Sequence, residues 1–138
     1  MDIQPLVDWQ EYVKEGHQYF KTAVNGIKRP EVFTPELVYQ ITAMAIEKML
    51  VGLSQFHRQM PGDHTLEGLV EGLDQICPLE AHLAEQVKAL GRLDNMCLLE
   101  PVNRLIPDDR EISAMLETAS QVEVFVLNQV GGLGQGEP

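Results

Sequence analysis

Four side chains that could carry out chemistry are grouped between positions 57 and 64 of the 138-residue chain: His57, Arg58, Asp63 and His64. Histidine and aspartate are common ligands of zinc. The spacing of His57 and His64, however, does not match the i, i+4 histidine pair of a metal-binding helix. Together with Asp63 they also lack a fourth ligand. The chain contains neither a Glu-x-x-His pair nor a Gly-x-Ser-x-Gly motif. These residues alone give no complete metal or catalytic site, and we expect no cofactor.

Glu47 and Lys48 are charged residues in the most apolar segment of the chain. Because burial of an unpaired charge is costly, they either lie at an edge of the fold or have partners. The alternative is that these two residues face a ligand. Cys77 and Cys97 have neither Cys-x-x-Cys spacing nor the density of a disulfide-rich secreted domain. They predict two reduced thiols and a cytoplasmic location.

The overall charge limits the partners of this protein. The chain has 10 Lys and Arg against 21 Asp and Glu, a net charge of −11. Such a surface repels phosphate backbones and anionic lipids, so we expect no DNA and no membrane. Any contact with RNA must be local or be made with help from a partner. We find neither a signal-peptide pattern nor an apolar run of about 18 residues. The length suits one domain.

A long central helix, predicted from about residue 35 to Gln59, must position these side chains. Its segment Leu37–Leu53 is apolar around most of the helix circumference, a pattern that requires neighbours on several sides. Thr34-Pro35 matches an N-cap followed by proline at the first helical position. The tight turn Met60–Asp63 contains a Pro-Gly pair and should end the helix.

Four other helical segments are predicted around the central one. The first ends near Gly26, and Gly16 in its apolar stripe indicates close approach of a neighbouring backbone. A short helix starts near His64, capped by Asp63 or Thr65, and a fourth starts at Pro78. The inward stripes of these three helices are Leu6, Trp9, Val13, Phe20, Ala23 and Ile27; Leu66, Leu69, Val70, Leu73 and Ile76; and Leu79, Leu83, Val87 and Leu90.

The C-terminal third contains two prolines, at positions 101 and 107, which argue against a regular helix between Asn95 and Pro107. We therefore expect Cys97–Leu99 in an irregular or short helical link. Asp108 and Glu111 have the spacing of a capping box that starts the last helix. Its inward stripe is Ile112, Met115, Leu116, Ala119, Val122, Val126 and Val130. The single domain thus covers residues 1–130, and the glycine-rich residues 131–138 are expected to be a disordered tail.

The middle of the chain resembles the HEPN family of small prokaryotic helical domains, named for nucleotide binding. Ala45–Leu50 reads Ala-Ile-Glu-Lys-Met-Leu, similar to the Ala-x-Glu-Lys-x-Leu core of that family. A loop with Met60-Pro61 then leads to His64-Thr65-Leu66, which is similar to the family's His-x-Leu helix start.

The resemblance implies an up-and-down bundle of four to five helices, usually a homodimer, often paired with a nucleotidyltransferase in a toxin–antitoxin system. Many members of the family are metal-independent RNases that use an arginine and a histidine four to six residues apart, usually late in the chain. Here no histidine follows His82, whereas Arg58 and His64 have five residues between them but straddle the turn.

We therefore predict an all-α, HEPN-like helical bundle that is dimeric and non-catalytic or degenerate. It would bind a nucleotide or a protein partner of the nucleotidyltransferase type, with Lys48, Arg58 and His64 as the binding residues. One alternative is a metal-independent endoribonuclease that uses Arg58 and His64. The other is a structural interaction bundle unrelated to that family.

Overall fold

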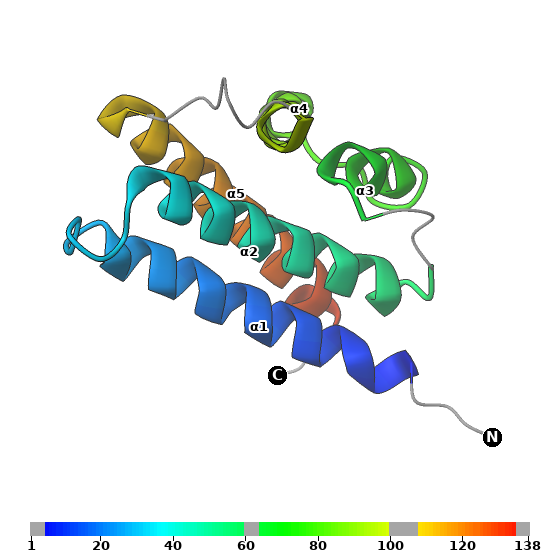
Figure 1. Cartoon of the computed structure of the whole chain (residues 1–138). Coiled ribbons are helices and arrows are strands. Elements are labelled where there is room, and N and C mark those ends of the chain that lie inside the picture. Colours follow the sequence, from blue (N-terminus) through cyan, green and yellow to red (C-terminus); the bar gives the residue numbers. More distant parts are fainter. Residues whose placement is uncertain (1–4, 60–63, 100–107, 135–138) are drawn as a thin grey trace.

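The chain forms five α-helices in the computed structural model, which describes residues 5–59, 64–99 and 108–134. They are α1 (Pro5–Gly26), α2 (Pro35–Phe56), α3 (Leu66–Leu73), α4 (Ala81–Leu99) and α5 (Asp109–Gly134) (Figure 1). No strand occurs within these ranges, and the predicted all-α helical bundle is confirmed. The expected turn at Met60–Asp63 lies outside the described residues, as do positions 100–107.

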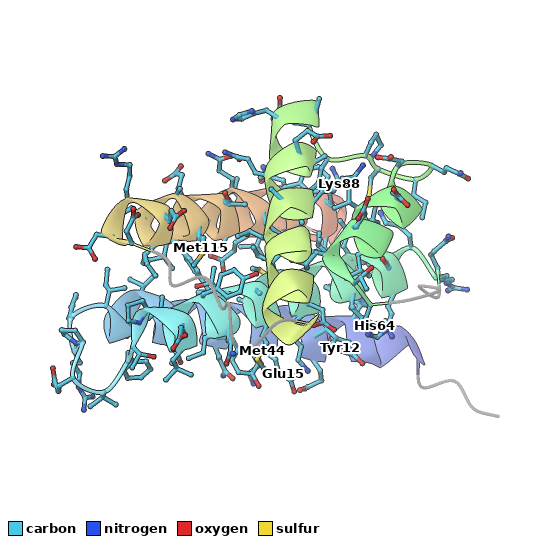
Figure 2. The ribbon with its side chains drawn as sticks, turned by 45° about the horizontal axis from the view of Figure 1, so that its top comes forward. Tyr12, Glu15, Met44, His64, Lys88 and Met115 are labelled. Atoms are coloured by element: carbon cyan, nitrogen blue, oxygen red, sulfur yellow. The ribbon has the colours of Figure 1, made fainter. Side chains whose placement is uncertain are left out.

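The helix α2 lies at the centre of the bundle. α1 lies antiparallel along one side of it, and α5 lies along another side in the same direction as α2 (Figure 1). α3 and α4 cover a further side, and α4 crosses α2 and α5 instead of running along them (Figure 2). Because α1 and α5 both pack mainly on α2, they meet each other along a shallow seam.

The start of α2 follows the predicted cap. The Thr34 hydroxyl accepts a hydrogen bond from the backbone N–H of Leu37 at 3.2 Å, and Pro35 is the first helical residue. The largest fully buried side chains of the helix are Val38, Ile46, Met49, Leu50, Val51 and Leu53. By length and composition α2 could also span a membrane, but 61% of its apolar stretch is buried inside the bundle. Burial by the neighbouring helices accounts for its apolar character.

Two glycines allow α1 and α2 to approach closely. A Cβ atom added to Gly16 would lie 2.5 Å from Met49 Cγ and 3.0 Å from the backbone oxygen of Ala45. A Cβ atom on Gly52 would lie 2.8 Å from a methyl carbon of Val13 and 3.0 Å from the backbone oxygen of Trp9. The close approach predicted at Gly16 is confirmed, and Gly52 is its counterpart on α2.

The central helix ends at Phe56, three residues before the predicted end at Gln59. The N–H of Gln59 bonds to the oxygen of Ser54 at 2.8 Å, and the N–H of Arg58 bonds to that of Gln55 at 2.8 Å. This pair of bonds closes a helix C-terminus and requires a left-handed residue, which is Arg58 with φ of 60°. The backbone therefore leaves the helix before the Pro-Gly pair is reached.

The boundaries of α3 and α4 also differ from the predictions. α3 begins at Leu66, two residues after the predicted start near His64, and its cap is Thr65, one of the two predicted caps, whose hydroxyl accepts from the N–H of Gly68 at 3.0 Å. α4 begins at Ala81 because the Glu80 carboxylate accepts from the N–H groups at its start. α4 also continues to Leu99, so the expected irregular link over Cys97–Leu99 is wrong. Proline disrupts a helix when it lies inside it, but Pro101 lies beyond Leu99, the last residue of α4.

The last helix begins with the predicted capping box. The N–H of Glu111 donates to Asp108 Oδ1 at 2.8 Å, and the N–H of Asp108 donates to Glu111 Oε1 at 2.9 Å. The helix reaches Gly134, four residues into the segment expected as a tail, and buried Val130 anchors this end. One member of the α1 stripe was misassigned: Ile27 is 45% exposed because α1 ends at Gly26.

Candidate functional site

Lys48, the first predicted binding residue, contacts α1. Its Nζ lies 3.0 Å from Glu15 Oε1 and 5.2 Å from the centre of the Tyr12 ring. The hydrogen bond with Glu15 raises the pKa of Lys48 above its ordinary value of 10.5, against the smaller effect of burial, which lowers it. The cation is therefore paired within the fold, as expected for a charge in this apolar helix.

His64, the second predicted binding residue, lies close to the same part of α2. Its Nδ1 is 3.6 Å from Glu47 Oε2, and both side chains are partly exposed. Figure 2 shows Tyr12, Glu15, Met44 and His64 on the same side of the molecule. The structure thus brings Lys48 and His64 to one surface, which carries the carboxylates of Glu15 and Glu47 beside them.

Arg58, the third predicted residue, is exposed at the end of α2. Its left-handed conformation is explained by the termination of the helix, so backbone geometry gives no separate indication of function. No hydrogen bond or ion pair joins Arg58 to His64 among the residues that the structure describes. The proposed RNase pair is therefore not assembled by a direct contact here.

His57 and Cys77 form a contact that sequence reasoning did not anticipate. His57 Nε2 lies 3.3 Å from Cys77 Sγ, and the His57 ring meets Phe56 edge-on. Burial raises the pKa of the half-buried Cys77 thiol above its ordinary value of 9.0. A protonated thiol is a poor nucleophile, so this pair does not resemble an activated cysteine. The two residues are 20 positions apart in the sequence, so no local spacing signal pointed to this contact.

Metal-ligating side chains do not cluster in the part of the chain that the structure describes. No group of three or more His, Cys, Asp and Glu residues is arranged there to hold a metal ion. Asp63, one of the four residues grouped near the turn, lies outside the described ranges, as does the side chain of Cys97. His17 is paired with Glu123 of α5.

The seam between α1 and α5 forms an open apolar groove, which we call the α1/α5 groove. Its apolar lining consists of Trp9, Val13, Leu127 and Val130. Gln10, Lys14, His17 and Glu123 complete the lining. Leu127 is 47% exposed, and Val124, three residues earlier on α5, is 57% exposed, which is high for large apolar side chains. Sequence periodicity assigned Trp9, Val13 and Val130 to the core but gave no sign of a groove between their helices.

A second hollow lies where the starts of α2 and α5 meet. Phe33, Pro35 and Val38 face Ile112 and Ser113 across it. The caps of the two helices, Thr34 and Asp108, already accept hydrogen bonds from their own backbones. Neither this hollow nor the α1/α5 groove is lined by Lys48, Arg58 or His64.

The structure thus defines the protein as an all-α helical bundle with an open apolar groove. Comparisons with family models, with curated proteins and with solved structures found no match. The resemblance to the HEPN family therefore stays a prediction.

Proposed function

We propose that this protein is a non-catalytic, HEPN-like bundle that binds another protein through the α1/α5 groove. The observation that carries the proposal is the groove itself, with its mostly apolar lining, the exposed Leu127 within it and the exposed Val124 on the same helix. Exposed apolar surface of this kind marks interaction sites in soluble domains. The predicted partner class is a nucleotidyltransferase-type protein or a second copy of the chain.

Charge favours a protein ligand over a nucleotide at the predicted binding residues. Lys48 and His64 each lie beside a carboxylate of the fold, at 3.0 Å and 3.6 Å. A phosphate would compete with these carboxylates and would experience the negative charge of the whole chain. Nucleotide binding by Lys48, Arg58 and His64 is therefore the weaker proposal.

Co-purification tests the proposed function in the source organism. Tagged wild-type protein, a Leu127→Glu variant in the groove and a Met44→Glu control should be compared. Met44 is a matched control because it is an exposed apolar residue of α2 outside the groove. We expect a stoichiometric protein partner that the wild type and the control retain and that Leu127→Glu loses. Equal recovery with all three proteins would contradict binding at the groove.

RNA cleavage and nucleotide binding are tested separately. Purified protein incubated with tRNA and mRNA should leave both intact, and an Arg58→Ala, His64→Ala double variant should behave in the same way. Cleavage by the wild type that the double variant lacks would establish the endoribonuclease alternative. A nucleotide at about 100 times its dissociation constant would add about 2.7 kcal/mol to the free energy of unfolding. A stabilisation that disappears in Lys48→Ala would establish nucleotide binding instead.

A further inference from the structure

We propose that the partner contacts the α1/α5 groove with an amphipathic helix that carries an acidic residue beside its apolar stripe. The inference rests on the proposed function, because it specifies the chemistry of the partner at the same groove. Three observations support it: the arrangement of the lining residues in layers, their mostly apolar character, and the placement of Lys14 among them.

The lining residues are arranged in three layers along the groove. α1 and α5 run in opposite directions (Figure 1), and His17 of α1 contacts Glu123 of α5, which fixes how the two helices are aligned. Each step toward the start of α1 therefore corresponds to a step toward the end of α5. The layers are His17 with Glu123, Val13 and Lys14 with Leu127, and Trp9 and Gln10 with Val130. From Trp9 to His17 the rise along α1 is about 12 Å, or about two helical turns.

A helix fits this lining better than an extended segment does. The apolar side chains of a helix at positions i, i+4 and i+7 lie on one face and recur about once per turn, so they can contact successive layers. A helix also pairs its own backbone N–H and C=O groups. An extended segment would place these groups against a mostly apolar lining that offers them few partners, which is costly.

Trp9 gives the groove an aromatic surface in its last layer. The ring of Trp9 meets Phe56 of α2 edge-on, with 5.0 Å between the ring centroids. Because this contact holds the ring, a partner would not have to order it on binding. Aromatic side chains of this kind often supply much of the binding energy of an interface. The apolar stripe of the partner helix should therefore reach from Leu127 in the middle layer to Trp9.

Lys14 determines the polar residue that the partner should carry. It lies in the middle layer on the α1 side, one helical turn from Gln10, and both side chains can donate hydrogen bonds. Among the residues that the structure describes, His17 is paired with Glu123, whereas Lys14 has no ion-pair partner. The α5 side of the same two layers is apolar. A carboxylate on the α1 side of the partner helix would thus be paired, and a lysine there would meet a like charge.

The net charge of the chain makes this prediction specific. A chain with a net charge of −11 attracts cationic peptides in general. That attraction comes from the whole surface and is screened over about 8 Å at physiological ionic strength, whereas the contact with Lys14 is local. A preference for an acidic helix is therefore opposite in sign to the preference that net charge alone would produce, so an experiment can separate the two.

Two synthetic amphipathic peptides of about 15 residues test the proposal on the full-length protein at about 0.15 M salt. Both carry leucine at positions i, i+4 and i+7 on an alanine background, and they differ in having either glutamate or lysine beside the leucines. Trp9, the single tryptophan of the chain, reports binding, because its emission should shift to shorter wavelength as a peptide displaces water. The glutamate peptide should bind saturably and at least about three-fold more tightly than the lysine peptide, as expected for one exposed charge pair. A scrambled glutamate peptide without the apolar stripe should not bind.

Variants of the protein locate the contact. Leu127→Glu should abolish binding of both peptides, while Met44→Glu on α2, outside the groove, should leave it unaltered. Lys14→Glu should reverse the preference, so that the lysine peptide binds more tightly. Lys88→Glu on α4, outside the groove (Figure 2), changes the net charge by the same amount as Lys14→Glu and should retain the preference for the glutamate peptide. Circular dichroism would establish that each variant remains folded.

Each outcome decides the proposal. A preference for the glutamate peptide that Lys14→Glu reverses and Lys88→Glu retains supports it. Tighter binding of the lysine peptide by the wild type, or equal binding of the scrambled peptide, overturns it. Binding of neither peptide also overturns it, and the co-purification experiment then still decides whether a partner of other chemistry uses the groove. An emission shift with protein concentration alone that Leu127→Glu abolishes would identify a second copy of the chain as the occupant and would overturn the proposal as well.

Discussion

Replacement of Gly16 by alanine should destabilise the fold, although alanine is the better helix former. Gly16 lies in the middle of α1, where alanine alone would add about 1 kcal/mol of helix stability. The new methyl group, however, would lie 2.5 Å from Met49 Cγ and 3.0 Å from the backbone oxygen of Ala45. Met49 is fully buried and cannot move its side chain into water. The contact can be relieved only by rearranging the core or by moving α1 away from α2.

The magnitude follows from these opposing effects. Overpacking of a tight core costs about 1–3 kcal/mol, and separation of α1 from α2 also loosens the contact at Gly52. Subtraction of the helix-propensity gain of about 1 kcal/mol leaves a loss of about 0–2 kcal/mol from the Gly16 contact alone. The loosened contact at Gly52 adds to this loss, so we expect the upper half of the range, about 1–2 kcal/mol. For a chain of this size each kcal/mol corresponds to about 3–4 °C in the melting temperature.

Gly72 in α3 provides the matched control. A Cβ atom there meets no heavy atom within 4 Å, so Gly72→Ala should stabilise the fold by about 0.5–1 kcal/mol. Urea unfolding followed by circular dichroism at 222 nm measures both variants. The two substitutions are chemically identical, so the prediction is a difference in sign. A Gly16→Ala variant as stable as the wild type would refute the close-approach argument.

Three further predictions concern local contacts. Arg58→Gly should stabilise the fold by about 0.5–1 kcal/mol, because glycine adopts the left-handed conformation freely, whereas Arg58→Ala should give no gain; thermal unfolding distinguishes them. Asp108→Ala should cost about 1 kcal/mol through loss of the capping box, and adding Glu111→Ala should cost less than additively in urea titrations. Burial raises the pKa of the Cys77 thiol above 9.0, because the buried site favours the neutral thiol over the thiolate. The fold is therefore unaffected by this group below pH 9.0 and loses stability as the pH rises through the folded-state pKa. Alkylation of Cys77 by iodoacetamide at pH 7.5, mapped by mass spectrometry, should be slower in the native protein than in urea; equal rates would contradict its burial.

Local sequence signals located the helix starts that depend on short-range hydrogen bonds. Thr34-Pro35 and the Asp108–Glu111 capping box both begin helices as predicted, because the residues that make the bonds are neighbours in the chain. The central position of α2 also followed from the sequence, since its apolar circumference needs neighbours on several sides. The predicted helix ends were less accurate. The end of α2 depends on the left-handed backbone conformation of Arg58, which few non-glycine residues adopt.

Contacts between helices could not be located in the same way. The ion pair of Lys48 with Glu15 and the contact of His64 with Glu47 join residues of different elements, and the sequence shows only that Glu47 and Lys48 lie at an edge of the fold or have partners. The α1/α5 groove depends on how far the two helices separate as they pack on α2. Periodicity identifies which face of each helix is apolar, but it contains no information on that separation.

The few cations of this acidic chain also bear on what it binds. An electropositive site for phosphate needs cations whose charge is not already balanced, whereas Lys48 is paired with Glu15 and His64 has the carboxylate of Glu47 beside it. Along α1 the residues separate by charge instead: Glu15 contacts Lys48 of α2, whereas Lys14 lines the apolar groove. A lysine beside apolar surface suits an amphipathic helix with an acidic residue beside its apolar face better than it suits a nucleotide, because most of the lining is apolar and offers a phosphate no hydrogen bond.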